Sequence, residues 1–195
     1  RNALLKQIQR QNYSSDFLDV WNEKLVQIGY KILKIRLEYV QEINTESTRI
    51  YSEISNQRES LKLKYISSII KGNKTDCISD EEVITSFANK LKSNENFDVN
   101  QGFTSVGPHK DDIEMTIQDL NLKKFGSQGQ QRSVVLSLKL AEATVLRRSI
   151  GEFPVVLLDD IMSELDDFRI DYIMSKLNNY QTFITGCNKD TVKYF

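Results

Sequence analysis

Two short stretches in the last third of the chain combine residue types that could bind a nucleotide. The first is Val155–Asp160 (VVLLDD), an apolar run that ends in two carboxylates. Such a run is typical of a strand buried on both faces of a parallel sheet, and α/β proteins bind ligands at the carboxyl ends of these strands. Asp159 is predicted to hold the water shell of a Mg²⁺ ion. Asp160 is predicted to orient or deprotonate an attacking water.

The second stretch is Gly126–Arg132 (GSQGQQR), which joins small and amide residues at the start of an expected helix. Ser127 is predicted to cap that helix, and Gly126 and Gly129 would let backbone N–H groups approach an anion closely. The positive end of the helix dipole favours the same anion, so the stretch predicts a phosphate cradle that uses no lysine. A plain capped loop, in which glycine and serine serve only the turn geometry, is the alternative interpretation.

The segments around these stretches alternate between helix and strand. Two helices are expected at 133–150 and 166–180, and two strands at 153–160 and 181–188. This order of helix, buried strand, helix and strand predicts an α/β half-domain with a parallel sheet.

Upstream of these segments the pattern is mixed. Residues 61–66 and 111–118 alternate apolar and polar positions as strands do, and 80–93 is expected to be a helix that Asp80 caps. The polar stretches 71–79 and 93–102 are expected to be loops.

The first part of the chain predicts a long amphipathic helix, with Asp16 as a plausible N-cap. Its apolar residues recur at spacings of three and four, as in a coiled-coil seam: Leu18, Trp21, Leu25, Ile28, Ile32, Ile35 and Tyr39. We expect this seam to be buried against another helix over ~35 Å, in an arm or in a helical bundle. The pattern then meets Glu42 and Glu46, which favours a short helical hairpin or arm over a longer rod.

The composition limits the classes of protein to which the chain can belong. The chain has 195 residues and a formal net charge of −1, which argues against strong overall attraction to nucleic acid but allows a local basic face. No apolar stretch reaches the ~18–20 residues that span a bilayer, so no membrane segment is expected. Cys77 and Cys187 fit no zinc or disulfide pattern and indicate free thiols in a reducing cytoplasm.

Together the motifs resemble those of the ATP-binding-cassette (ABC) ATPases. Gly126–Gln130 is similar to their signature motif, Val155–Asp160 to their Walker B strand, and Ser163–Asp167 to the D-loop that follows. More narrowly, the chain resembles the RecF family of bacterial DNA replication and repair proteins over nearly its whole length. The further stretches that carry this resemblance are RNALLK (1–6), GPHKDD (107–112), LKLAEA (138–143) and LLDDIMSELD (157–166).

The resemblance implies a fold and a division into domains. The expected fold class is α/β: the C-terminal half of an ABC-type P-loop ATPase head with an N-terminal helical, coiled-coil-like arm. Residues 1–95 would form the arm and 96–195 the ATPase lobe. The lysine-containing phosphate loop (Walker A) is absent, because KGNKT at 71–75 lacks its glycine spacing. We therefore expect a C-terminal fragment of a weak ATPase, inactive alone.

The resemblance also implies roles for individual residues. Two chains would sandwich two ATP molecules, with Mg²⁺, and act as a homodimer. The signature residues Ser127, Gln128, Gly129 and Gln130 would then contact the nucleotide held by the partner chain. Asp159 and Asp160 would act on the chain's own nucleotide, Ser163 and Asp166 would reach across the interface, and Thr185 would occupy the switch position.

By the same resemblance the partners would be double-stranded DNA at single-strand gaps and the mediators RecR and RecO, which help to load the recombinase RecA. An SMC- or Rad50-type ATPase head is a second possibility. Gln128 and Asp160 favour RecF, because those families carry Gly and Glu at these positions. A non-catalytic helical interaction module is the third possibility, based on the heptad pattern and the missing phosphate loop.

Overall fold

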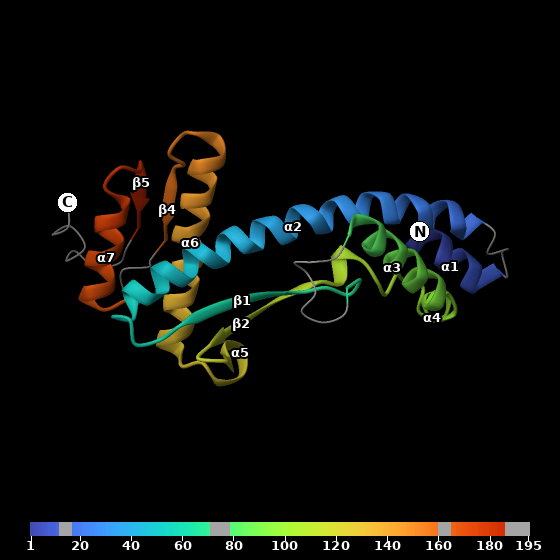
Figure 1. Cartoon of the computed structure of the whole chain (residues 1–195), viewed down its shortest axis with the longest axis horizontal. Helices are drawn as coiled ribbons and strands as arrows, with labels where there is room; N and C mark the ends of the chain where they lie inside the picture. Colours follow the sequence, from blue (N-terminus) through green and yellow to red (C-terminus); the bar gives the residue numbers. More distant parts are fainter. Residues whose placement is uncertain (12–16, 71–78, 160–164, 186–195) are drawn as a thin grey trace. The chain divides into compact units, whose positions relative to one another are not determined.

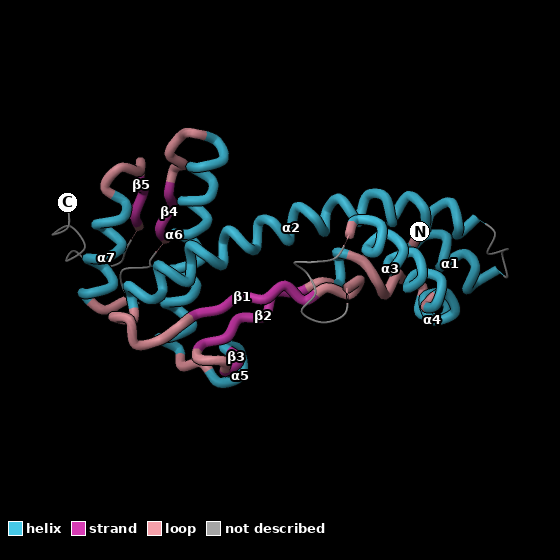
Figure 2. The backbone as a smooth tube through the Cα atoms, viewed as in Figure 1, coloured by secondary structure: helices cyan, strands magenta, loops and turns pink. Residues whose placement is uncertain are grey.

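The computed structural model describes residues 1–11, 17–70, 79–159 and 165–185 (Figure 1). Helices predominate, and the described strands are short (Figure 2). The chain divides into two compact units, neither of which is continuous in sequence. Unit 1 comprises residues 1–41 and 63–114, and unit 2 comprises 42–62 and 115–195. The division into an arm at 1–95 and a lobe at 96–195 stays a prediction.

Unit 1 is mainly helical. Its helices are α1 (Asn2–Gln11), the first part of α2 (Leu18–Ile54), α3 (Asp80–Ser93), α4 (Glu95–Gln101) and the 3₁₀ turn η3 (Pro108–Lys110). The main core cluster contains Val26, Leu33, Ile69, Ile70, Val83, Phe87, Leu91 and Val106. Because α4 occupies much of 93–102, the predicted loop there is wrong. Asn94 begins this helix and Gly102, with a φ of 70°, ends it.

The start of α3 differs slightly from the prediction. Ser79, not Asp80, is the N-cap, and it forms a capping box with Glu82. Asp80 is instead the first helical residue, where its negative charge interacts favourably with the helix dipole.

Apart from Leu18, which is buried as predicted, helix α2 buries a different face from the predicted seam. Trp21 is 51% exposed, Ile28 58% and Ile35 65%, whereas Val26 and Leu33 are buried. The reason is Gly29: a Cβ there would lie 2.6 Å from Cε1 of Phe87, so the missing side chain admits this α3 ring. The heptad interpretation counted only apolar side chains and therefore missed a face on which glycine makes the contact.

Helix α2 is also longer than expected. It runs unbroken for 37 residues to Ile54, or about 55 Å at 1.5 Å per residue. Glu46, where the sequence predicts that the apolar pattern ends, lies on the buried face and is 5% exposed. It is tolerated there because arginine side chains pair with it, as described below. The predicted short hairpin is therefore wrong, and Asp16 lies outside the described residues.

The GPHKDD motif holds unit 1 together locally. The Asp111 carboxylate accepts hydrogen bonds from Tyr65 Oη at 2.7 Å, Ser68 N at 2.7 Å and Ser68 Oγ at 2.8 Å. Gly107 N–H donates to Ser68 Oγ at 2.9 Å. Burial and the Asp111 carboxylate raise the pKa of Tyr65 to about 12, so its hydroxyl stays a donor. His109 of the same motif is also held within unit 1, since its Nε2 lies 2.9 Å from Thr104 O. The motif thus has a structural role in this chain.

Unit 2 contains the rest of α2, α5 (Leu122–Phe125), α6 (Gln128–Ile150) and α7 (Asp167–Leu177). The strands β1 (Leu61–Ile66), β2 (Asp112–Ile117) and β3 (Leu120–Asn121) form one sheet in that order, and the boundary between the two units falls within β1 and β2. Strands β2 and β3 are antiparallel, and the two turn residues between them, Gln118 and Asp119, have left-handed φ values of 48° and 64°. Such a two-residue turn matches the twist of a hairpin.

The second sheet is a pair of strands, β4 (Val156–Leu158) and β5 (Thr182–Ile184) (Figure 2). The two strands run parallel, with Leu157 opposite Phe183. The predicted parallel arrangement is therefore confirmed. The predicted burial of β4 on both faces is wrong for the described residues, since Leu158 is 6% exposed but Leu157 is 73% exposed. Among the described residues, β4 is therefore buried on one face only. None of the described helices is long and apolar enough to cross a bilayer.

Candidate functional site

The signature stretch forms the capped start of α6, as predicted. Ser127 is the N-cap, with an extended backbone, and its Oγ accepts the N–H of Gln130 at 3.2 Å. Gln130 Oε1 in turn accepts the N–H of Ser127 at 2.9 Å, which completes a capping box. The Ser127 hydroxyl can still donate its own proton, because it uses a lone pair in the cap.

The two glycines of this stretch serve different purposes. A Cβ on Gly126 would lie 2.6 Å from both the carbonyl oxygen and Cδ1 of Leu122, so Gly126 is required by packing within the chain. A Cβ on Gly129 would meet nothing within 4 Å. Gly129 is the second residue of α6, and glycine is a weaker helix former than alanine by up to about 1 kcal/mol. No contact described within the chain therefore requires glycine at this position.

The predicted Walker B and switch residues lie together at the ends of β4 and β5. Thr185 Oγ1 donates a hydrogen bond to Asp159 Oδ1, and Thr185 N–H donates to Leu158 O at 2.9 Å. The parallel pairing of the two strands places both side chains at the same edge. Asp160 and Ser163 lie outside the described residues, as do Cys77 and Cys187.

A Mg²⁺ ion would find oxygen ligands at this edge. Asp159 and Thr185 supply a carboxylate and a hydroxyl, which suit a hard cation that keeps several of its waters. Among the described residues no group of three His, Cys, Asp or Glu side chains is placed to hold a metal directly. These two side chains fit the outer-shell role of Asp159, which stays a prediction.

The predicted D-loop residue Asp166 caps helix α7. Its Oδ1 accepts the N–H of Arg169 at 2.9 Å, and its other oxygen pairs with the Arg169 guanidinium. Arg169 Nε also donates to Ser133 Oγ at 2.8 Å, and Ser133 Oγ donates to the Gly129 carbonyl at 2.8 Å. A continuous chain of hydrogen bonds therefore connects the D-loop with the signature motif.

A cavity of about 410 Å³ lies beside the signature motif. Its walls include Ser127, Gly129, Gln130 and Asp166, together with residues from the end of α2 and the turn after it. Sequence reasoning missed Ser133 and Arg169, which join the two motifs. The only hint in the sequence was serine at 133 and 137 inside a helix, where the hydroxyl commonly bonds back to the preceding turn.

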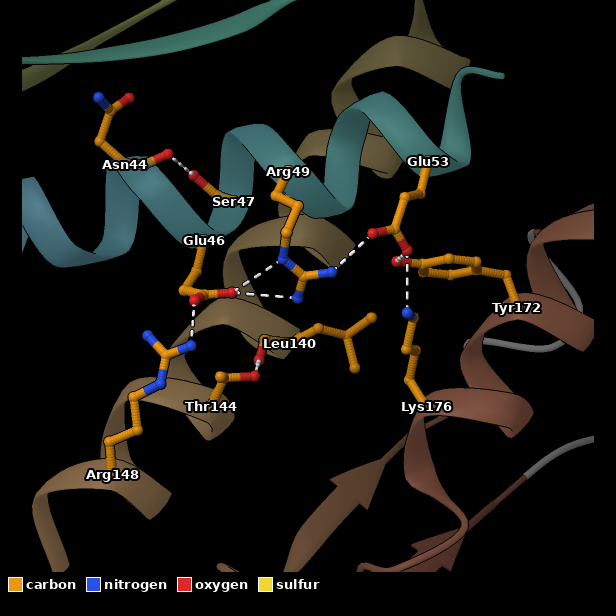
Figure 3. Close-up of polar contacts among 10 residues, drawn as sticks. All are labelled: Asn44, Glu46, Ser47, Arg49, Glu53, Leu140, Thr144, Arg148, Tyr172 and Lys176. Atoms are coloured by element: carbon orange, nitrogen blue, oxygen red, sulfur yellow. Dashed lines mark hydrogen bonds and ion pairs between the residues drawn. The ribbon is translucent and has the colours of Figure 1, made fainter. Parts of the chain in front are cut away.

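Helices α6 and α7 are held to the end of α2 by two carboxylates (Figure 3). Glu46 accepts hydrogen bonds from Arg49 Nε at 3.2 Å and from its Nη2 at 3.0 Å, and it pairs with Arg148 of α6. The second carboxylate is Glu53, which accepts from Tyr172 Oη at 2.8 Å and pairs with Lys176 of α7 at 2.9 Å. These contacts fix the two helices that begin with the signature motif and the D-loop residue.

The charges of both carboxylates are stabilised in the folded chain. Burial alone would raise the pKa of Glu46, but hydrogen bonds from Arg49 and Arg148 outweigh it and lower the pKa below its ordinary value of 4.5. Glu53 behaves in the same way, since Lys176 and Tyr172 outweigh its burial and lower its pKa. A carboxylate with a lowered folded-state pKa stabilises the fold above its ordinary pKa. This stabilisation is lost as the pH falls through the lowered value.

Replacing Arg148 by alanine is expected to destabilise the folded chain by about 1–2 kcal/mol at pH 7, because Glu46 would stay buried with Arg49 as its main partner. The cost should shrink in acid, as the pH falls through the lowered pKa of Glu46 and its carboxylate becomes protonated. Urea unfolding followed by circular dichroism at several pH values measures both effects.

The matched control is Lys139→Ala on the same helix. This change removes the exposed pair with Glu142 and should cost about 0.3 kcal/mol. An equal loss in both variants would contradict the role of Glu46.

No protein-family model matches the chain. It is 38% identical over 190 residues to the DNA replication and repair protein RecF of Acetivibrio thermocellus, an alignment that covers 97% of this chain and 51% of that protein. It is 39% identical over 196 residues to RecF of Natranaerobius thermophilus, covering 97% of this chain and 50% of that protein.

Solved structures give the same result. A structure described as the recombination mediator protein RecF with ATP in the RecFOR pathway superposes with a TM-score of 0.85 at 36% identity, covering 99% of this chain and 51% of that one. This match confirms the predicted α/β fold class. The chain spans about half the length of the curated relatives it matches. In sequence and in fold, the chain therefore corresponds to about half of a RecF protein, which confirms the predicted resemblance over the part that it spans.

Proposed function

We propose that this chain works as part of a RecF-type DNA-repair ATPase and supplies the signature, Walker B and D-loop residues of an ATP site. The observation that carries the proposal is Gly129, a glycine in the first turn of α6 with nothing of the described chain within 4 Å of a Cβ. The capped start of α6 directs backbone N–H groups and the positive end of its dipole outward beside this glycine. A nucleotide γ-phosphate held by a second chain fits this surface.

In this proposal each residue has a defined task. Ser127 donates its hydroxyl proton to the γ-phosphate of the partner's nucleotide, and Gly129 allows close approach. Asp159 orients the Mg²⁺ water shell, and Thr185 orients Asp159 through their hydrogen bond. Asp160 accepts a proton from the attacking water. ATP thus joins two chains, and hydrolysis releases them.

The proposed partners follow from the same family. The complete protein would bind double-stranded DNA near single-strand gaps in the cytoplasm and act with RecR and RecO in loading RecA. Contacts to DNA phosphates would come from lysine and arginine side chains, so binding should weaken as salt rises.

One experiment tests the proposal. A chain of the full length of the RecF relatives that carries this sequence is expected to be a monomer without nucleotide and a dimer with ATP and Mg²⁺. Sedimentation velocity measures the change, and the 195-residue chain alone serves as the control that should stay monomeric. DNA binding by the dimer should fall by at least about tenfold between 50 and 200 mM salt. A complete chain that neither dimerises with ATP nor binds DNA would overturn the proposal.

A non-catalytic interaction module is the second candidate. It is favoured by the exposed apolar residues on the first part of α2, among them Trp21, Ile28 and Ile35. Such residues often mark a surface that binds another protein. This candidate predicts a partner-bound chain whose oligomeric state does not respond to ATP.

A further inference from the structure

The turn that follows α2 contains an acidic residue that contacts the signature motif. Asn56 and Gln57 have left-handed φ values of 52° and 59°, which reverse the chain at the end of the helix. Gln57 N–H donates to Ser52 O at 2.7 Å and fixes this reversal. Glu59 follows two residues later and lines the 410 Å³ cavity beside the signature residues.

Both oxygens of the Glu59 carboxylate are used. Oε2 accepts the hydroxyl of Tyr51 at 2.5 Å, and Oε1 accepts Nε2 of Gln130 at 2.8 Å. Tyr51 is 1% exposed, and its burial and the nearby Glu59 raise the pKa of its hydroxyl, so Tyr51 remains a donor at neutral pH. The carboxylate is therefore held by a buried group on one side and presents its other oxygen to Gln130.

This contact determines which way the Gln130 amide points. A carboxylate only accepts hydrogen bonds, so the NH₂ group of Gln130 has to face Glu59. The amide oxygen then faces the opposite way, where it accepts the N–H of Ser127 at 2.9 Å. If the amide were reversed, two acceptors would meet at Glu59 and two donors at Ser127. Only one orientation of Gln130 satisfies both neighbours.

We propose that Glu59 is a positioning residue for the signature motif: it fixes the amide of Gln130 and thereby the backbone and hydroxyl of Ser127. The inference rests on the proposed function, because it assigns a role in the same ATP site. A capping box can form from its two residues alone. Here a third residue orders the long Gln130 side chain before the nucleotide arrives, so less ordering remains to be done when two chains meet.

The test uses the complete protein and measures the ATP concentration that gives half-maximal dimerisation in the presence of Mg²⁺. Glu59→Ala is expected to raise this concentration about tenfold, in line with the tenfold loss for 1.4 kcal/mol of lost preorganisation. Glu59→Gln should raise it only about two- to threefold, because its amide oxygen can still accept from Gln130 while its NH₂ donates to Tyr51. Glu142→Ala, which removes an exposed carboxylate from α6, is the matched control and should change nothing.

A double-mutant cycle separates positioning from general stability. In a Gln130→Ala background, Glu59→Ala should have no further effect on the ATP requirement, because the side chain through which it acts is gone. An additional tenfold effect in that background, or a wild-type ATP requirement for Glu59→Ala alone, would overturn the inference. Tyr51→Phe provides a second variant that keeps the buried ring, and it should give a two- to threefold increase. Wild-type protein that fails to dimerise with ATP would instead overturn the proposed function, and this inference with it.

Discussion

Replacing Gly129 by leucine is expected to leave the isolated chain at least as stable as the wild type and to weaken ATP-driven dimerisation of the complete protein. The added side chain meets nothing in the described chain, since a Cβ there has no neighbour within 4 Å. Leucine is also the better helix former, by up to about 1 kcal/mol. A stability gain combined with a functional loss is unusual, because most substitutions that impair function also destabilise the fold.

The functional loss follows from what has to approach Gly129. In the proposed dimer the phosphate of the partner's nucleotide lies against the first turn of α6, and a leucine side chain would stand between them. Forcing extra methylene groups into a packed interface typically costs about 1–3 kcal/mol, which corresponds to roughly a 5- to 150-fold weaker dimer. Sedimentation velocity with ATP measures the dimer, and thermal unfolding of the 195-residue chain measures the fold.

Two other glycines are matched controls. Gly151 ends α6 with a φ of 83° and also has open space around its Cβ, so Gly151→Ala should cost about 1 kcal/mol of stability without changing dimerisation. Gly126→Ala should impair folding itself, because its Cβ would clash with the Leu122 carbonyl. Normal dimerisation of the Gly129→Leu protein would show that the signature motif does not face a partner's nucleotide.

The sequence was sufficient where the structure depends on local pattern. A serine followed three residues later by glutamine predicts a helix cap, and Ser127 and Gln130 form one. An apolar run that ends in carboxylates predicts a strand whose carboxyl end carries ligands, and β4 places Asp159 beside Thr185. Both predictions need only neighbours along the chain and the rule that parallel strands end at one edge.

The sequence was insufficient where contacts depend on tertiary structure. The buried face of α2 was missed because Gly29 contributes no side chain to the pattern, yet it admits Phe87. The apolar pattern predicts that the buried face of α2 ends at Glu46, because its partner Arg148 lies more than a hundred residues further along the chain. Glu59 and Arg169 reach the signature motif from separate elements, and no spacing along the chain reveals such a contact.

Replacing Asp160 by asparagine in the complete protein is expected to lower the rate of ATP hydrolysis by about 10²–10⁴-fold while ATP-driven dimers persist. Asparagine has nearly the same size as aspartate but cannot accept the proton of the attacking water, and removing a general base typically costs this much. Asp160 follows Asp159, whose carboxylate is held by Thr185 at the end of β4. In the proposed site Asp159 orients the water shell of the metal, which leaves Asp160 to act on the attacking water.

The two aspartates should be separable in one pair of assays. Asp159→Asn removes the charge that orients the Mg²⁺ water shell, so it should weaken both dimerisation and hydrolysis, whereas Asp160→Asn should affect hydrolysis alone. Single-turnover release of phosphate measures the chemical step, and the lifetime of the dimer after ATP is diluted measures the trapped state. Because hydrolysis releases the partners in the proposed cycle, the Asp160→Asn dimer should outlive the wild-type dimer. An unchanged rate of phosphate release would remove Asp160 from the mechanism and leave the signature surface as an ATP-binding site only.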